Sequence, residues 1–357
     1  MNNPVIILFV RKTKLPVQFI IVCALLTGCF IFSHAQQAPR FSQYLMNEFL
    51  INPSVAGYDG RTTLNLAARK EWLGFSDEIN TPETYALSFQ TRLLKNPSQI
   101  TSNKHGNKLK KQSKGRVGLG ASLYTDVNGA LRRTGFQFTY AYHIFSSNAQ
   151  FSMGLTGSVI QLRFQTDEML FRNSANEVML IVAQSPAWMP DFGFGINYMR
   201  QDFHLGASVA QIFQSPFIFG NSDIEYNVTD LGQRRQYYFL GAMRKSFRRN
   251  PRWEYEPSFL LKLYDLFNFS SGLNGPGSQL DASIKLLYDR KYWFGVSYRT
   301  KFDFVVLGGL KYKKLYLCYS FDYGTSEILK TTYGSHEISI STKFGDSQRR
   351  YRWLERY

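Results

Sequence analysis

The chain has 357 residues, a formal net charge of +16 and only three cysteines. Hydrophobic residues make up 44% of it and aromatic residues 16%, which is enough for a large folded body. A chain this basic usually meets nucleic acid, a membrane surface or an acidic partner. Nucleic acid is the least favoured of these for an exported chain, and the N-terminus indicates export.

The N-terminus has the parts of a secretory signal peptide. A basic patch leads into an apolar run over 19–32, and a small-residue end follows at 33–35. We expect 1–35 to be removed as the signal peptide, which leaves Cys318 as the one cysteine of the mature chain and excludes an internal disulfide. An alternative is a lipoprotein box in which Cys29 is lipidated.

Residues 36–60 come before the first strand-like segment. They mix aromatic residues with Gln and Asn around Pro39, Pro53 and Gly57. If the strands that follow close into a barrel, this segment either folds into the lumen as a plug or fastens the N-terminus to the barrel wall. The residues leave both interpretations open.

Segments that alternate apolar and polar residues fill the rest of the chain. In the segment from Lys314, Leu317, Tyr319 and Phe321 share one face of a strand, because successive strand side chains point to opposite sides. We predict fourteen strands, over 61–70, 83–93, 115–125, 133–144, 150–164, 191–199, 202–210, 234–245, 252–264, 279–289, 291–300, 302–312, 314–323 and 335–344.

These strands have the length that a transmembrane β-strand needs, about 9–11 residues. Beyond the signal, no window holds the ~18 uncharged apolar residues of a spanning helix. The pattern therefore predicts an all-β chain in which 61–344 forms a single antiparallel transmembrane barrel. A soluble β-sandwich is the rival, but its outward faces would be the polar ones.

The connections alternate between long and short. If the first strand rises outward, the outer connections are 71–82, 126–132, 165–190, 211–233, 265–278, 301 and 324–334. Six of these seven are longer than the short inner turns, as in outer-membrane barrels with both ends of the chain in the periplasm.

The inner connection 94–114 is an exception, since it is long and rich in lysine. Other basic clusters, around 246–251 and in the tail 345–357, fall on the same predicted periplasmic side. They form either a solvated edge against anionic headgroups or a docking surface for an acidic periplasmic partner. The docking candidates are Lys104, Lys108, Lys110, Lys111, Lys114, Arg248, Arg249, Arg349 and Arg350.

The sequence shows no arrangement typical of an active site, a metal site or a cofactor site. His143, His204 and His336 lie on three separate predicted strands, without metal-ligand spacing. Ser335 and Glu337 flank His336, and neighbours on a strand face opposite sides, so the three cannot form a catalytic triad among themselves. We expect no enzymatic activity and no cofactor.

Several blocks at both ends of the mature chain stand out. They are PRFSQYLMNEFLINPSVAG over 39–57, ARKEWLGF over 68–75, TPETYALSF over 81–89 and GSHEISI over 334–340. Their succession closely resembles the PorP/SprF family of the Bacteroidetes type IX secretion system. The resemblance covers essentially the whole mature chain. It points to Phe41, Ser42, Gln43, Tyr44, Asn52, Pro53, Gly57, Trp72, Gly74, Pro82, Ser335, His336 and Glu337 as family-motif residues.

Three departures from the family pattern make the transfer of a particular partner less direct. Glu71 stands where Gln is usual, Ser54-Val55 replaces Ala-Tyr, and the lysine-rich connection is an insertion.

The resemblance implies an outer-membrane protein needed for secretion or surface anchoring of adhesin-type cargo, including gliding adhesins. Its partners would be the C-terminal region of a secreted adhesin and other periplasmic or outer-membrane components of the system. We expect cargo contact at the two longest outer connections, through Phe171, Trp188, Phe213, Phe217 and Tyr226. The alternative function is a hydrophobic solute transporter or porin-like channel.

Overall fold

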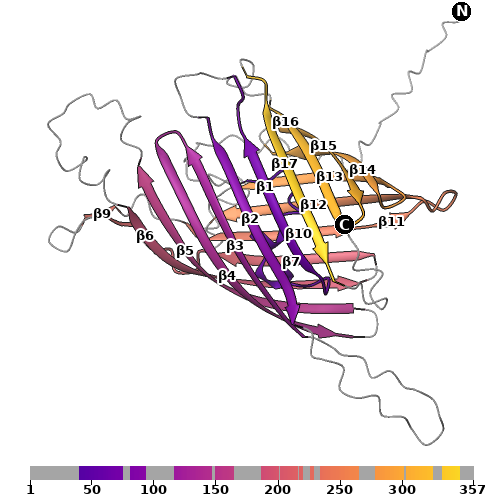
Figure 1. Ribbon diagram of the computed structural model, residues 1–357, viewed down its shortest axis with the longest axis horizontal. Helices are drawn as coiled ribbons and strands as arrows, with labels where there is room; N and C mark the ends of the chain where they lie inside the picture. The colour runs from indigo at the N-terminus through magenta and orange to yellow at the C-terminus, as the bar shows by residue number, and fades with distance from the viewer. Residues whose placement is uncertain are drawn as a thin grey trace, which may run out of the picture.

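Fourteen antiparallel strands form one closed barrel in the computed structural model (Figure 1). The structure describes residues 40–74, 81–93, 116–146, 149–164, 186–200, 202–215, 217–219, 226–228, 234–264, 278–300, 303–324 and 332–345. The barrel strands are β1 (Thr62–Lys70), β2 (Glu83–Leu93), β3 (Val117–Asn128), β4 (Leu131–Phe145), β5 (Ala149–Phe164), β6 (Ala187–Arg200), β7 (Phe203–Ala210), β10 (Gln236–Met243), β12 (Trp253–Tyr264), β13 (Gln279–Tyr288), β14 (Tyr292–Arg299), β15 (Asp303–Tyr312), β16 (Leu315–Gly324) and β17 (Ser335–Phe344).

Neighbours in sequence are neighbours in the sheet, and the first strand closes the ring on the last. β1 pairs with β17 from Thr62 opposite Phe344 to Lys70 opposite His336. Farther round, β10 pairs with β12, and the two-residue β11 (Lys245–Ser246) extends the same hairpin. The closed ring leaves no free edge in the barrel, which is the condition for a sheet to span a membrane. The predicted fold class is confirmed.

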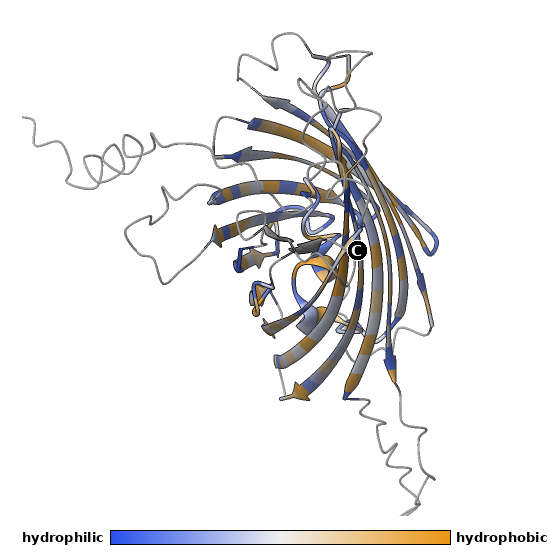
Figure 2. Ribbon diagram, turned by 90° about the vertical axis from the view of Figure 1, so that its left-hand side faces the viewer, coloured by the Kyte–Doolittle hydropathy of each residue, from blue (hydrophilic) through white to orange (hydrophobic). Residues whose placement is uncertain are grey.

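The two faces of the wall differ as the alternation predicts. Ile338 and Ile340 of β17 point outward and are exposed, whereas Glu337, Ser339 and Ser341 point inward and are buried. Figure 2 shows the same alternation of hydrophobic and hydrophilic residues along the strands. Because a lipid-facing wall must be apolar, the barrel has the outside of a membrane protein and a polar inside.

The two ends of the barrel are named here by their connections. The turn end carries the short turns at 289–291 and 313–314, and the loop end carries the connection from β1 to β2. No helix among the described residues is long and apolar enough to cross a membrane.

The structure differs from the sequence prediction at three connections. The outer connection 126–132 is a two-residue turn at 129–130, because Val127 and Asn128 continue the β3 ladder to Arg132 and Leu131. The connection 211–233 contains a separate hairpin, β8 (Phe217–Phe219) with β9 (Tyr226–Val228). β6 begins at Ala187, four residues before the predicted start.

Candidate functional site in the barrel lumen

Residues 40–60 run through the lumen from the loop end to the turn end. Arg40 binds Glu71 at the loop end, with 2.8 Å between Nη2 and Oε2. Asp59 binds the Lys343 ammonium at the turn end, also at 2.8 Å. Between them lie two single turns of helix, η1 (Glu48–Leu50) and η2 (Pro53–Val55), which Figure 2 shows inside the ring of strands. We call residues 40–60 the lumen segment.

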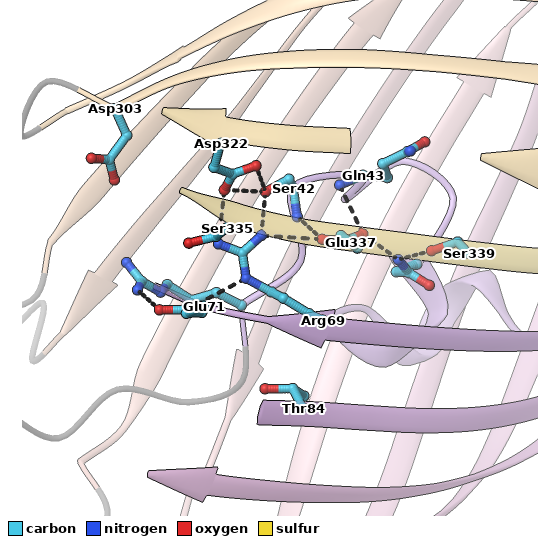
Figure 3. A network of polar contacts seen from close by, with 12 residues as sticks. Ser42, Gln43, Arg69, Glu71, Thr84, Asp303, Asp322, Ser335, Glu337 and Ser339 are labelled. Carbon is cyan, nitrogen blue, oxygen red and sulfur yellow. Dashed lines mark hydrogen bonds and ion pairs between the residues drawn. The ribbon is translucent and has the colours of Figure 1, made fainter. Parts of the chain in front are cut away.

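Charged side chains from the strands surround the start of the lumen segment (Figure 3). Arg69 of β1 is buried and donates to Asp322 of β16 at 2.7 Å, to Glu71 at 2.9 Å and to Glu337 at 3.4 Å. Arg299 of β14 also reaches Asp322, at 3.1 Å. The charges of these buried groups are therefore paired, which the low-dielectric interior requires.

Ser42 joins the lumen segment to this cluster. Its hydroxyl donates to Asp322 Oδ2 at 2.6 Å and accepts from Arg69 Nη1 at 2.7 Å. Its backbone N–H donates to Glu337 Oε2 at 2.6 Å. Arg299 Nη2 also donates to this hydroxyl, at 3.2 Å. Because all three partners of the hydroxyl are charged, these hydrogen bonds belong to the stronger class. Ser42 thus fastens the start of the lumen segment to β1, β16 and β17.

The acids just outside the strands keep their charge. Burial by itself would raise the pKa of Glu71, but Arg40 and Arg69 outweigh it and lower that pKa to about 2. Burial also opposes ionisation of Asp59, and there the Lys343 ammonium, with Arg92 farther away, makes the net shift of the pKa downward. Both ends of the lumen segment are thus held by ionised carboxylates at neutral pH.

Neutral contacts hold the middle of the segment. The Tyr44 hydroxyl lies 2.8 Å from Ser258 Oγ and 2.9 Å from Ser283 Oγ, on β12 and β13. Two strands along the ring from β12, Ser208 of β7 donates to the Ile51 carbonyl at 2.7 Å. These contacts therefore hold the segment to the side of the wall that runs from β7 to β13.

Two glycines let the segment approach the wall. A Cβ at Gly118 would lie 1.9 Å from the Ala56 carbonyl oxygen, and one at Gly154 would lie 2.4 Å from the backbone carbon of Pro53. No side chain fits at such distances, so glycine at these strand positions is required by the close approach of another backbone.

A cavity remains between the lumen segment and the wall formed by β3 to β7 and β10. About 820 Å³ there is not filled by protein atoms, and part of this space is open to solvent. Apolar and amide side chains line it together, among them Phe41, Phe49, Tyr124, Gln137, Ile160 and Tyr238. Among the described residues, no group of three or more His, Cys, Asp or Glu side chains could hold a metal ion.

The chain can be compared with known protein families. The family described as "Type IX secretion system membrane protein PorP/SprF" matches residues 33–342. The chain belongs to the PorP/SprF family. No curated protein matches it.

Solved outer-membrane barrels resemble the PorP/SprF chain distantly. The toluene transporter TbuX of Ralstonia pickettii has a TM-score of 0.46 and 12% identity, over 83% of this chain and 93% of that one. Omp33 of Acinetobacter baumannii has a TM-score of 0.40 and 6% identity, over 81% of this chain and 100% of that one. These scores carry no conclusion about function.

The structure brings most of the PorP/SprF motif residues together around the lumen segment. Phe41, Ser42, Gln43, Tyr44, Asn52 and Pro53 are buried, and the Gly57 N–H donates to Gln90 Oε1. Trp72 and Gly74 have positive φ, and between them Leu73 pairs with residues 333 and 334. Pro82 accepts from the Glu71 N–H.

Neighbouring residues of the GSHEISI block, 334–340, face opposite sides of the barrel wall. Ser335 and Glu337 are buried inside, whereas the His336 ring lies on the outside, 2.6 Å from the Tyr319 hydroxyl. This agrees with the prediction that the three cannot act together as a triad.

The candidate contact residues are spread over both ends. Phe213 is 64% exposed near the loop end, and Phe217 and Tyr226 lie in the β8–β9 hairpin. Trp188 does not lie in a loop, because β6 has already begun, and it is exposed on the outer wall. Arg248 and Arg249 are exposed at the turn end. Phe171, Lys104, Lys108, Lys110, Lys111, Lys114, Arg349 and Arg350 lie outside the described residues, as does the predicted signal peptide.

The main charged residues of the site escaped the sequence prediction. Arg69, Arg299 and Asp322 were not singled out, nor was Asp281, which accepts from Arg299 at 3.1 Å. Each occupies an inward position near the loop end of its strand. The signal available was a charge at a lumen-facing position. Which charges meet depends on barrel closure and could not be read from the residues.

Proposed function

We propose that this chain is a non-enzymatic outer-membrane component of the type IX secretion system that serves secretion or surface anchoring of adhesin-type cargo. In this proposal the loop end faces the cell exterior and the turn end faces the periplasm. The observation that carries it is a lumen segment held at both ends by partly buried ion pairs, in a chain of the PorP/SprF family. A porin needs an open, water-filled lumen instead.

Cargo and machinery would then contact opposite ends. The C-terminal region of a secreted adhesin would contact the loop end, where Phe213 is exposed beside the cavity wall. Its ring packs against Phe192 at a centroid distance of 5.3 Å, which holds it in place for a contact. Periplasmic components of the system would contact the turn end, including the lysine-rich connection 94–114.

The surface proteome of a deletion strain tests the proposal. Loss of one or a few adhesins from the surface, restored by the wild-type gene, is the expected result. An unchanged surface proteome together with altered uptake of a hydrophobic solute would overturn the proposal in favour of the transporter.

A substitution then tests the loop end. Phe213→Ala should lower the amount of surface adhesin, whereas Tyr312→Ala, which removes an equally exposed aromatic ring from the turn end, should leave it unchanged. Both variants should reach the outer membrane in normal amount.

A further inference from the structure

A row of aromatic side chains crosses the outer wall near the turn end, over five neighbouring strands from β11 to β15 and the turns between them. Trp253 packs on Tyr288 at a ring centroid distance of 4.9 Å, and Tyr292 is 56% exposed. The row consists of Phe247, Trp253, Tyr255, Tyr288, Tyr292 and Tyr312. Exposed aromatic rings at one height of a barrel mark the level of the membrane interface. We call this row the aromatic row.

Basic side chains lie directly beyond the aromatic row, in the turns after β10, β13 and β15. They are Lys245, Arg248, Arg249, Arg252, Arg290, Lys291, Lys313 and Lys314, and all are exposed. Two of them have acidic partners: Lys291 binds Asp289 at 3.2 Å, and Arg290 binds Glu254 at 2.8 Å. We call these eight residues the basic rim. Its positive charge far exceeds the negative charge of the described residues beside it.

The turns that carry the basic rim adopt a costly backbone conformation. Asp289, Arg290 and Lys313 have φ of +51°, +53° and +55°. Two-residue hairpins with such angles normally contain Asn and Gly, and other residues cost roughly 1 kcal/mol each there. Two of the three positions, 290 and 313, carry basic residues in spite of that cost, which indicates that their charge has a use.

We propose that the basic rim binds the headgroups of anionic phospholipids, with the aromatic row against the glycerol and upper acyl chains. The arrangement within the β11–β12 hairpin favours lipid over an acidic protein. Lys245 stands opposite Tyr255, whose ring packs at 5.2 Å from that of Phe247, so a cation and two rings share the lipid-facing side. Lys313 likewise lies over the Tyr312 ring, 5.4 Å from its centroid. A protein that approached from the periplasm would contact the tips of the turns, but not these rings.

The headgroups belong to the periplasmic leaflet if the orientation in the proposed function is correct. Binding itself does not depend on that orientation, because the basic rim exists whichever way the barrel faces. The lipid test and the cargo test can therefore fail separately.

The test uses the full-length protein in a neutral detergent. Native mass spectrometry would count bound phosphatidylglycerol, with phosphatidylcholine as the uncharged comparison, for the wild type and for Arg248→Gln/Arg249→Gln. Each basic residue near an anionic lipid surface contributes roughly 1 kcal/mol, or about a fivefold change in affinity, so the double variant should bind phosphatidylglycerol at least about tenfold more weakly. Salt at about 1 M, where the Debye length is about 3 Å, should weaken wild-type binding similarly.

A matched control removes two cations from the loop end. Arg132 and Arg163 face each other across β4 and β5 and are both exposed. Arg132→Gln/Arg163→Gln should bind phosphatidylglycerol as the wild type does. Equal binding by the wild type and the Arg248 and Arg249 variant would overturn the proposal. If that variant keeps its lipid but loses co-purifying periplasmic protein, the rim is a protein docking surface instead.

Discussion

Arg69 is the residue on which the loop-end contacts converge. It pairs with Asp322 and Glu337 across the seam where β1 meets the last strands, and it also donates to Ser42 of the lumen segment. An intact buried ion network of this kind adds little to the stability of the fold. Removal of one partner costs much more, because the other charges stay buried with fewer counter-charges. Arg69 therefore couples the wall to the segment.

Replacing Arg69 by Ala should destabilise the barrel by about 3–5 kcal/mol, because the buried Glu337 would lose its cation and Asp322 would keep only Arg299. The urea midpoint of unfolding in detergent measures this. Lys70→Ala is the control, since Lys70 is the next residue, lies on the outside and binds Glu83 in an exposed pair that contributes at most about 1 kcal/mol. Equal losses in the two variants would contradict the role given to the buried cluster.

The sequence of β1 shows which features of this strand can be predicted from residues alone. In TTLNLAARK the alternation predicts that Thr63, Asn65 and Arg69 face inward, and all three are buried. It does not predict that Asn65 donates to Asn47, because the lumen segment follows no strand or helix period that would fix its path. Whether a side chain faces the lumen depends on its position in its own strand. Which residue it bonds to depends on how the whole ring is assembled.

The lumen segment behaves as a structural element without regular secondary structure of its own. Its two helical turns have three residues each, too short to be stable alone. Its order comes from contacts with the wall, such as His143 of β4, whose Nε2 lies 3.0 Å from the Ala56 carbonyl oxygen. Changes in the wall should therefore displace it.

Gly154→Ala tests this dependence. The new methyl group would overlap the backbone at Pro53, and overpacking of this kind typically costs about 1–3 kcal/mol. We expect a lower thermal midpoint and faster hydrogen exchange in residues 50–57. Gly157→Ala on the same strand is the control, because its Cβ would have only an ordinary contact, 3.7 Å from Phe192. Unchanged exchange in the Gly154 variant would mean that the segment is not held by this close approach.

Strands were predictable because a membrane barrel imposes the period of two on every one of them. The bounds of β2 and β17 agree with the prediction at both ends. The turn at 129–130 and the β8–β9 hairpin were not foreseen, since ladders of two or three residue pairs are too short to show an alternation. Prediction is thus weakest for the short ladders in the connections.

At the scale of the whole molecule, the lumen segment decides whether the barrel can conduct. Ion pairs hold it at both ends, and between them Tyr44 contacts β12 and β13 while Ile51 contacts Ser208 of β7. Cavities lie beside it both toward β3 to β7 and toward β12 and β13. Because the segment is held in place inside the ring, we expect the barrel to be closed to free diffusion of large solutes while the segment is there.

Removal of residues 40–56 should open the lumen. We expect the variant to show ion conductance in planar bilayers and to sensitise cells to a large hydrophilic antibiotic, and the wild type to show neither. Removal of 217–228 is the control, because the β8–β9 hairpin forms a separate sheet. A folded variant without the segment, verified by heat-modifiable gel migration, that still fails to conduct would refute this view of the lumen.

The meeting of β1 and β17 also has a kinetic consequence. Arg69 and Glu337 are 268 residues apart in the chain, and they come together only when the first and last strands pair. The backbone N–H of Ser42 needs the same carboxylate, so the lumen segment cannot complete its hydrogen bonds before that moment. Ring closure and capture of the segment should occur as one late step, slow because its contacts are so distant in sequence. The barrel would thus be sealed as it is finished, with no open intermediate left in the membrane.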